Sequence, residues 1–356
     1  MKYLSLFSGI GGFELGIQQA YELQQMGIES KDSTDITSAT SQHSEHPLCI
    51  GYSEIDKYAT KVYQHHFPSH KQYGDITKIN ANELPDFDFL VGGFPCQAFS
   101  IAGKRKGFDD TRGTLFFDIA RILRAKQPRL FLLENVKGLL SHDNGNTFKT
   151  IISTLDELGY DLQWQVLNSK NHGVPQNRER IFIVGHLRGT SRPQVFPFIG
   201  SDEQDDRRIN IVAHRDIYRR NRQTFGADGL VEALDTAQGG GRGHHVKIAA
   251  MRGRNPENPS DRTVGAPTEQ RLEVNENGTS NTLTSVGKDN LVLESMKIRR
   301  LTPTECERLQ GFPDGWTGVE NTSDSQRYKM CGNAVTVNVI RDIMSKIISE
   351  AEIKSK

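Results

Sequence analysis

Residues 2–27, KYLSLFSGIGGFELGIQQAYELQQMG, combine three local patterns in a fixed order. The apolar run over residues 3–7 predicts a short buried strand, and a glycine-rich turn follows it. Phe13, Ile17 and Tyr21 then recur at the spacing of one helix face. A strand, a tight turn and a helix in this order predict the opening of a parallel α/β sheet.

The same alternation of helix and strand continues to about residue 190. Short apolar runs predict buried strands, and longer segments with helical spacing predict helices. The predicted strands cover 46–56, 86–93, 129–136 and 178–187, and the predicted helices cover 114–128 and 147–160. We therefore expect an α/β fold with its ligand site at the carboxyl ends of the strands.

Composition indicates how the chain is organised. Its 356 residues allow one or two domains. Residues 28–47 are rich in Ser and Thr and predict a surface insertion. Residues 191–296 are rich in Gly, Asn, Thr and Arg and lack a long helical pattern, whereas 334–352 has the apolar spacing of a last helix. We predict a first domain over 1–190, a smaller irregular β-rich domain over 191–296, and a return to the first domain over 297–356.

The bulk properties restrict the possible partners. The formal net charge is zero, from 44 Lys and Arg against 44 Asp and Glu, so a nucleic acid would have to be held by a local basic patch. No apolar run is long enough for a membrane span, and the first residues lack a signal-peptide cleavage pattern. The cysteines form no close pair, which argues against a CxxC zinc site and a disulfide framework and favours a reducing cytoplasm. These are Cys49, Cys96, Cys306 and Cys331.

The glycine turn after the first predicted strand indicates a cofactor site. Backbone N–H groups and the start of a helix face a ligand at this point of an α/β fold. The dinucleotide spacing is not met, because Glu14 stands where the third glycine would be. A smaller anionic group, such as an amino-acid carboxylate, fits the turn better than a pyrophosphate. The alternative is that the glycines serve only the turn.

Two acids end the next predicted strands. Glu54 reaches the spacing of a ribose-binding acid once the 28–47 insertion is discounted, and Asp75 lies where it could accept a bond from an adenine amino group. Either acid alone could be a solvated surface residue. Together with the glycine turn they predict an adenosine-type cofactor without a pyrophosphate, which favours S-adenosylmethionine.

Cys96 is the candidate nucleophile. It follows the predicted strand 86–93 and so falls at the carboxyl edge of the sheet. A lone cysteine is more often a buried filler, which would be inert. Pro95 and two glycines flank it, and basic residues follow at 104–106. Such surroundings lower a thiol pKa and supply a thiolate.

Acidic and basic side chains belong to the neighbouring loops. Glu134 and Asn135 end the predicted strand 129–136, and Arg178 and Arg180 alternate on entry to the next one. A carboxylate near arginine could be purely structural. A cysteine, a glutamate and an arginine from three successive loops at one sheet edge favour a catalytic site.

The motifs FSGIGG, PCQ, ENV, QNRER, RLTPTECERLQGFP and GNAV stand in this order along the chain. As an ordered set they resemble the DNA (cytosine-5)-methyltransferase family of bacterial and phage type. The resemblance covers residues 1–190 and 297–345. It implies a Rossmann-like sheet for S-adenosylmethionine-dependent methyl transfer, with a β-rich target-recognition domain in the unmatched region 191–296.

The resemblance implies methylation of cytosine C5 within a specific short sequence of double-stranded DNA. Cys96 would add to C6 of a flipped-out base, and Glu134 would hold or protonate N3. Arg178 and Arg180 would fix the base carbonyl and neighbouring groups, with Arg180 favoured as the direct contact. Asn135 would support the turn at Pro95. The expected product is S-adenosylhomocysteine, without a metal, and the expected setting is a cytoplasmic monomer of a restriction-modification system or a phage protective methylase. A cognate endonuclease would be a genetic, not a physical, partner.

The same resemblance implies further binding residues. Those for the cofactor are Phe7, Gly9, Ile10, Gly11, Gly12, Glu54, Asp75, Ile76, Pro95, Leu115, Asn333 and Val335. Those for DNA are Gln97, Ser100, Arg105, Gly240, Arg242, Thr282 and Leu283.

Two alternatives remain. A tRNA-directed enzyme of the same fold would share these motifs, although the large arginine- and glycine-rich region 191–296 favours a DNA duplex. A non-catalytic DNA-binding regulator would be expected to lack Cys96, Glu134 or Arg180, and all three are present.

Overall fold

The computed structural model divides the chain into two compact units, which we describe separately. The first comprises Met1–Leu167, Glu179–Ile199 and Val335–Lys356, and the second comprises Asn168–Arg178 and Gly200–Ala334. No helix in the described part of the chain is long and apolar enough to cross a membrane. The structure describes residues 1–26, 47–95, 115–191, 193–198, 211–212, 224–225, 247–256, 269–275, 279–283, 290–294 and 297–353.

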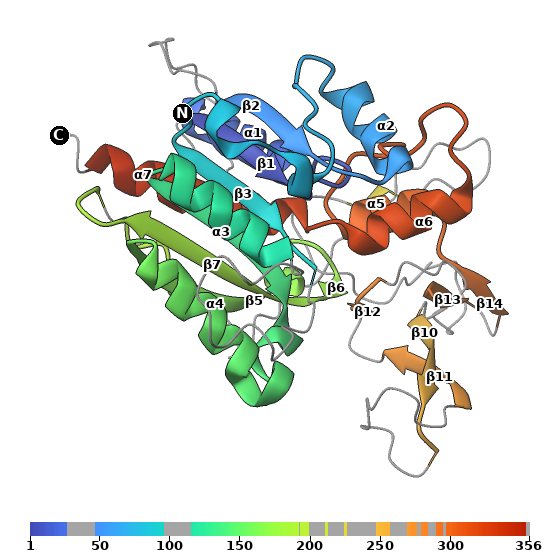
Figure 1. Cartoon of the computed structure of the whole chain (residues 1–356). Helices are drawn as coiled ribbons and strands as arrows, with labels where there is room; N and C mark the ends of the chain where they lie inside the picture. The colour runs from blue at the N-terminus through green and yellow to red at the C-terminus, as the bar shows by residue number, and fades with distance from the viewer. Residues whose placement is uncertain are drawn as a thin grey trace. The chain divides into compact units, whose positions relative to one another are not determined.

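A six-stranded sheet with the order β2-β1-β3-β4-β7-β5 forms the centre of the first unit (Figure 1). Its strands are β1 (Lys2–Leu6), β2 (Leu48–Ser53), β3 (Phe89–Gly93), β4 (Leu130–Val136), β5 (Tyr160–Asn168) and β7 (Glu179–Leu187). Strand β1 pairs in parallel with β2 and β3, and β3 pairs in parallel with β4. The predicted α/β sheet is therefore confirmed.

Helices cover both faces of this sheet (Figure 1). They are α1 (Gly12–Gln25), α2 (Lys57–His66), α3 (Leu115–Lys126), α4 (Asn146–Glu157) and α7 (Val337–Ile353). Side chains alternate along each strand, so Phe131 and Leu133 of β4 pack with α3 and α4, whereas Leu130 and Leu132 pack with α1 and α7. This two-sided burial explains why the central strands are continuous apolar runs.

Strand β7 runs antiparallel to β4, so the sheet that opens with parallel strands is mixed, and the sequence analysis did not specify this direction. The reason lies in the connection between β5 and β7, which are neighbours in the sheet. A parallel neighbour requires a crossover, usually a helix, whereas residues 169–178 supply only the 3₁₀ helix η7 (Ser169–His172) and the short strand β6 (Gln176–Asn177). As a result, the start of β7 lies at the same sheet edge as the end of β4.

The last helix, α7, packs against the first helix, α1, within the first unit. Phe13 and Ile17 of α1 share an apolar cluster with Val339 and Ile340 of α7, and Tyr3 of β1 belongs to the same cluster. A Cβ atom on Gly16 would lie 2.7 Å from the Cβ atom of Ile340. The two helices approach this closely because position 16 has no side chain.

The described residues of the second unit form short strands, the α-helices α5 and α6, and the 3₁₀ helix η7. A four-stranded antiparallel sheet has the order β11-β10-β13-β14, and two-stranded pairs join β12 to β6 and β8 to β9. The elements are β8 (Ile211–Val212), β9 (Thr224–Phe225), β10 (Lys247–Arg254), β11 (Glu269–Asn275), β12 (Ser280–Asn281), β13 (Asn290–Glu294), β14 (Lys297–Arg300), α5 (Pro303–Leu309) and α6 (Asp324–Asn333). This agrees with the β-rich character predicted for the smaller domain.

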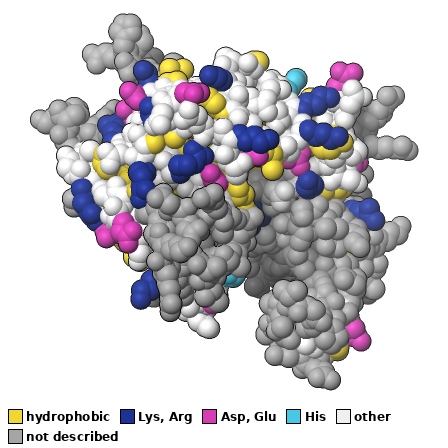
Figure 2. Space-filling view, viewed as in Figure 1, with side chains coloured by type: hydrophobic (Ala, Val, Ile, Leu, Met, Phe, Trp, Pro, Cys, Tyr) yellow, Lys and Arg dark blue, Asp and Glu magenta, His cyan; other side chains and the backbone are white. Residues whose placement is uncertain are grey.

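The contact-based boundaries differ from the predicted domain limits at both ends, because the second unit also includes Asn168–Arg178 and resumes at Gly200 rather than at 191. Residues 297–334 belong to the second unit, and the chain returns to the first unit at Val335 rather than at 297. Helices α5 and α6 pack with Leu283 and Leu301 in one apolar cluster, which keeps them in the second unit. On the face drawn in Figure 2, the described Lys and Arg side chains are scattered among Asp and Glu.

Candidate active site

Glu134 and Arg180 form an ion pair where β4 ends and β7 begins. The distance from Arg180 Nε to Glu134 Oε1 is 2.9 Å, and the two side chains are only 16% and 12% exposed. The antiparallel register places Arg180 opposite Val136, two residues beyond Glu134. Arg180 Nη1 also donates to the Glu179 carbonyl at 2.9 Å. The structure thus brings together two of the predicted catalytic residues.

Gly93 leaves room for the carboxylate of Glu134. The two residues are direct neighbours in the β3–β4 register. A Cβ atom on Gly93 would lie 3.0 Å from Glu134 Oε2, closer than nearly all real contacts of this kind. A side chain at position 93 would therefore displace the carboxylate.

Asn135 fixes the backbone that leads to Cys96. Its side chain is 2% exposed, and its Nδ2 donates to the Phe94 carbonyl at 2.9 Å. Its Oδ1 accepts from the Val136 N–H at 2.8 Å, which fixes the amide. The expected support for the Pro95 turn therefore takes the form of a bond to the residue before Pro95.

The other three cysteines are poor nucleophiles. Cys49, Cys306 and Cys331 are all buried, and burial raises the pKa of the Cys49 and Cys306 thiols to about 12. Burial also raises the pKa of the Cys331 thiol well above its usual range. A protonated thiol does not attack, so none of these three competes with Cys96 for a nucleophilic role.

The glycine turn is tied to Glu54. The Gly9 N–H donates to Glu54 Oε2 at 2.9 Å, and Glu54 Oε1 accepts from the Ile55 and Asp56 N–H groups at 2.8 and 2.7 Å. Gly9 and Gly11 have φ values of 54° and 90°, which explains why glycine occupies both positions. The carboxylate predicted to bind ribose is therefore held at the end of β2 by three backbone bonds.

Three further cofactor candidates lie near the ends of β2 and η1 (Ile76–Lys78). Asp75 is half-buried and caps η1, and its hydrogen bonds with Thr77 lower the pKa of its carboxyl. Ile76 is buried, and its carbonyl accepts from Arg121 Nη2 of α3 at 2.9 Å. The prediction overlooked Ile55, whose large apolar side chain is 76% exposed beside Glu54. Its position directly after the strand-end acid is the signal that could have identified it.

The remaining cofactor candidates differ widely in exposure. Pro95 is exposed, Phe7 and Leu115 are half-buried, and Ile10 and Gly12 are buried. Val335 packs in the apolar cluster of α1 and α7. Asn333 is exposed at the end of α6 and belongs to the second unit, whereas the glycine turn belongs to the first.

Arg178 makes different contacts from Arg180. It belongs to the second unit and is 2% exposed, and its Nη2 donates to the Gly332 and Ala334 carbonyls at 3.2 and 2.8 Å. These bonds hold the backbone on both sides of Asn333. They favour a positioning role for Arg178 over direct contact with a substrate.

Thr282 and Leu283 are the two predicted DNA contacts that the structure describes. The Thr282 hydroxyl donates to the Asn177 carbonyl at 2.9 Å. The Leu283 side chain is 3% exposed within an apolar cluster, which favours a structural role over the predicted DNA contact. The predicted site residues outside the described part of the chain are Cys96, Gln97, Ser100, Arg105, Gly240 and Arg242.

Glu14, which the sequence analysis treated only as a departure from the glycine spacing, is a buried acid. It lies in the first turn of α1 and is 1% exposed, and desolvation raises its pKa from 4.5 to about 7. The Tyr63 hydroxyl donates to Glu14 Oε1 at 2.9 Å and lies 3.0 Å from His70 Nδ1.

Among the residues that the structure describes, no cluster of three or more His, Cys, Asp and Glu could hold a metal ion.

Comparison with known proteins gives a consistent family. A family model described as C-5 cytosine-specific DNA methylase matches residues 1–349. The type II methyltransferase M1.ScrFI of Lactococcus lactis subsp. cremoris is 36% identical over 360 residues, covering 100% of this chain and 79% of the relative. M.HhaI of Haemophilus parahaemolyticus is 33% identical over 369 residues, covering 99% and 96%. M.HaeII of Haemophilus aegyptius is 38% identical over 361 residues, covering 100% and 95%.

Solved structures share the fold at low sequence identity. The DNMT2 protein of Spodoptera frugiperda, solved as a mutant, superposes with a TM-score of 0.56 at 19% identity, covering 98% of this chain and 99% of that one. The methyltransferase EhMeth of Entamoeba histolytica superposes with a TM-score of 0.54 at 16% identity, covering 99% and 98%. These likenesses concern the fold alone.

Proposed function

The chain belongs to the C-5 cytosine-specific DNA methylase family and is a DNA (cytosine-5)-methyltransferase, and from this premise we propose its substrate and mechanism. It methylates one cytosine within a short specific sequence of double-stranded DNA, in the cytoplasm of a bacterial or phage-infected cell. The named relatives are type II methyltransferases, which supports a role as the modification enzyme of a restriction system or as a phage protective methylase. The observation that carries the proposal is the Glu134–Arg180 pair beside the β3 end that leads to Cys96.

Cytosine C5 is too weak a nucleophile to take a methyl group unaided, and the proposed site corrects this. The Cys96 thiolate adds to C6, the C5=C6 electron pair forms a C4=C5 bond, and the C4=N3 pair moves to N3, which takes a proton from Glu134. Glu134 holds N3 and the exocyclic amine, which makes C6 more electrophilic. Arg180 fixes the carboxylate and faces the base carbonyl.

The later steps restore the aromatic base. S-Adenosylmethionine, when bound, supplies an electrophilic methyl group to C5. The C4=C5 electron pair forms the bond to that methyl group, and N3 returns its proton to Glu134 as C4=N3 reforms. The C5 proton then leaves to a base, the C5–H electron pair forms C5=C6, and the C6–S pair leaves on Cys96 as a thiolate. Because stacking covers C6 inside a duplex, the cytosine must first leave the helix. Gln97 and Ser100, close to Cys96 in sequence, are the proposed contacts to the opened DNA.

The residues at the ends of β1 and β2 suit an adenosine cofactor with an amino-acid tail. Glu54 is fixed by three backbone N–H groups, so its remaining lone pairs can accept from ribose hydroxyls. A Cβ atom on Gly9 would meet nothing within 4 Å, which leaves space above the turn. Ile55 offers an exposed apolar surface for the face of the adenine, and Asp75 an acceptor for its amino group.

The substrate class can be tested with radiolabelled S-adenosylmethionine. We expect label to enter duplex DNA, whereas label entering only tRNA would establish the rival tRNA-directed enzyme. Failure to label either would favour the non-catalytic regulator.

The mechanism can be tested at Cys96. The substitution Cys96→Ser should abolish methylation while cofactor binding is kept, and Cys306→Ser, which changes a buried thiol, is the matched control. Duplex DNA with 5-fluorocytosine at the target should trap a covalent complex with the wild type, because fluorine cannot leave as the C5 proton does. Retained turnover in Cys96→Ser, or the absence of an adduct under turnover conditions, would contradict the mechanism.

A further inference from the structure

Gln176 joins two segments that are remote in sequence. Its side chain is fully buried in β6, within the second unit. Oε1 accepts from the Leu283 N–H at 3.1 Å, and Nε2 donates to the Leu309 carbonyl at 2.7 Å. Both polar ends of one amide are thus used by backbone groups 107 and 133 residues away.

The backbone around Gln176 also holds residues 279–283. Strand β12 pairs in parallel with β6, with Ser280 opposite Gln176. The Ser280 N–H donates to the Pro175 carbonyl at 2.7 Å, and the Thr282 hydroxyl donates to the Asn177 carbonyl at 2.9 Å. A pair of two-residue strands fixes its register weakly, and a slip by one residue would turn every side chain to the opposite face. The Gln176–Leu283 bond just beyond β12 specifies a single register.

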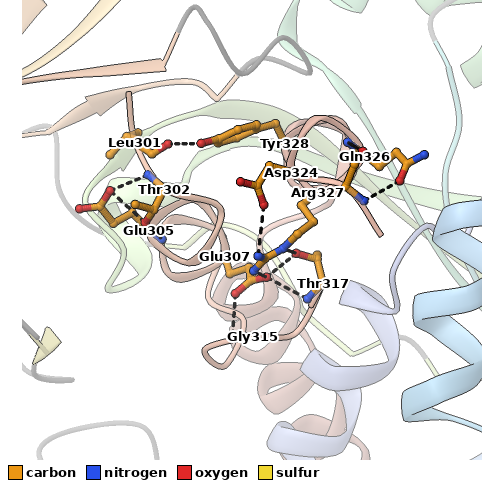
Figure 3. Close-up of polar contacts among 11 residues, drawn as sticks. Leu301, Thr302, Glu305, Glu307, Gly315, Thr317, Asp324, Gln326, Arg327 and Tyr328 are labelled. Carbon is orange, nitrogen blue, oxygen red and sulfur yellow. Dashed lines mark hydrogen bonds and ion pairs between the residues drawn. The ribbon is translucent and has the colours of Figure 1, made fainter. Parts of the chain in front are cut away.

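The Leu309 carbonyl, which accepts from Gln176 Nε2, ends helix α5, and polar contacts at both ends of that helix are drawn in Figure 3. Helix α5 begins with a capping box between Thr302 and Glu305. Glu307, with no exposed surface, accepts from the Gly315 and Thr317 N–H groups at 2.7 and 2.8 Å and from Arg327 Nη2 at 3.0 Å. The carbonyl of Leu309, the last residue of α5, is therefore a fixed reference for Gln176.

We infer that Gln176 is a positioning residue for sequence recognition. It sets the register of residues 279–283 against the segment that carries Arg178, and Arg180 follows two residues later in the chain. Arg178 ties the same segment to the Gly332 and Ala334 carbonyls. This inference rests on the proposed function and on the expectation that Thr282 contacts the DNA.

The test compares two buried glutamines. Gln176→Met keeps the shape of the side chain and leaves the Leu283 N–H and the Leu309 carbonyl without their amide partner. Gln310→Met is the matched control, because Gln310 is equally buried and its Nε2 donates to the Cys331 carbonyl at 2.8 Å rather than to the Leu309 carbonyl. The preferred sequence is first read from bisulfite sequencing of DNA from cells that express the wild type.

Methylation rates are then measured on that duplex and on duplexes with one changed base pair. Gln176→Met should reduce the ratio of kcat/KM between cognate and altered duplexes by roughly tenfold, while the KM for S-adenosylmethionine stays within about twofold. Gln310→Met should lower thermal stability without changing that ratio. Equal loss of discrimination in both variants, or unchanged discrimination in Gln176→Met, would overturn the inference.

The variant Gln176→Glu keeps the acceptor for the Leu283 N–H, but it replaces the amide donor with a carboxyl group that faces the Leu309 carbonyl and should lower stability. It should retain discrimination, and its loss there would overturn the inference even if Gln176→Met fails to fold. A wild type that methylates no duplex would instead refute the proposed function, so the two failures are distinguishable.

Discussion

We expect the substitution Glu14→Gln to change how the stability of the protein depends on pH. Glu14 is 1% exposed, and loss of hydration on burial raises its pKa from 4.5 to about 7. The hydrogen bond from the Tyr63 hydroxyl, 2.9 Å from Oε1, offsets only part of that shift. Glutamine keeps the acceptor for Tyr63 and removes the titrating proton.

The sign of the effect follows from the raised pKa. The folded protein binds the proton more tightly than the unfolded chain does, so this contribution to stability is complete below pH 4.5 and is lost as the pH rises through about 7. The interval between these two pKa values, at about 1.4 kcal/mol per pH unit, corresponds to about 3 kcal/mol of unfolding free energy. In Glu14→Gln this loss should be absent.

Urea unfolding followed by circular dichroism between pH 4.5 and 8.5 measures the difference. The unfolding free energy of Glu14→Gln minus that of the wild type should increase by about 3 kcal/mol across this range. Glu22→Gln, an exposed position on the same helix, is the control for the loss of one carboxylate. Parallel pH profiles for the wild type and Glu14→Gln would refute the argument.

Two glycine positions give further tests. Gly16→Ala places a Cβ atom 2.7 Å from the Cβ atom of Ile340, so overpacking should cost about 1–3 kcal/mol in thermal unfolding. Gly138→Ala, whose new Cβ atom would have no neighbour closer than 4.0 Å, should change stability far less, and equal losses would contradict the packing argument. Gly93→Ala places a Cβ atom 3.0 Å from Glu134 Oε2, so the kcat for methylation should fall about tenfold or more while cofactor affinity is kept, because misplaced catalytic groups are costly. An unchanged kcat would show that the carboxylate position is not critical.

The alternation of strands and helices was predictable because each element has a local apolar period. The direction of β7 was not, because residues 178–187 read the same whether their neighbour is parallel or antiparallel. That direction is decided by the short connection from β5, and it has a consequence for the site. A parallel β7 would begin at the opposite edge of the sheet, far from the end of β4. The predicted meeting of Glu134 and Arg180 therefore depends on a strand direction that the sequence pattern does not contain.

The residue types of the site were also easier to predict than their burial. Arg178 and Arg180 are two residues apart, yet one binds backbone carbonyls and the other binds Glu134, because different elements surround them. Glu14 was read only as a departure from the glycine spacing, although Phe13 and Leu15 on either side of it are apolar. The apolar neighbours of Glu14 in the first helical turn were the available signal that the acid is buried.

The surroundings of Glu134 give its two carboxylate oxygens different tasks. Oε1 accepts from Arg180 Nε at 2.9 Å, whereas Oε2 lies on the side of Gly93. An oxygen that already accepts from a guanidinium has fewer lone pairs free to meet the cytosine ring. Gly93 is followed by Phe94, whose carbonyl accepts from Asn135, and then by Pro95 and Cys96 in the chain. Oε2 therefore lies beside the end of β3 that leads to Cys96. We therefore expect proton exchange with the cytosine ring to use Oε2, while Arg180 orients the carboxylate through Oε1.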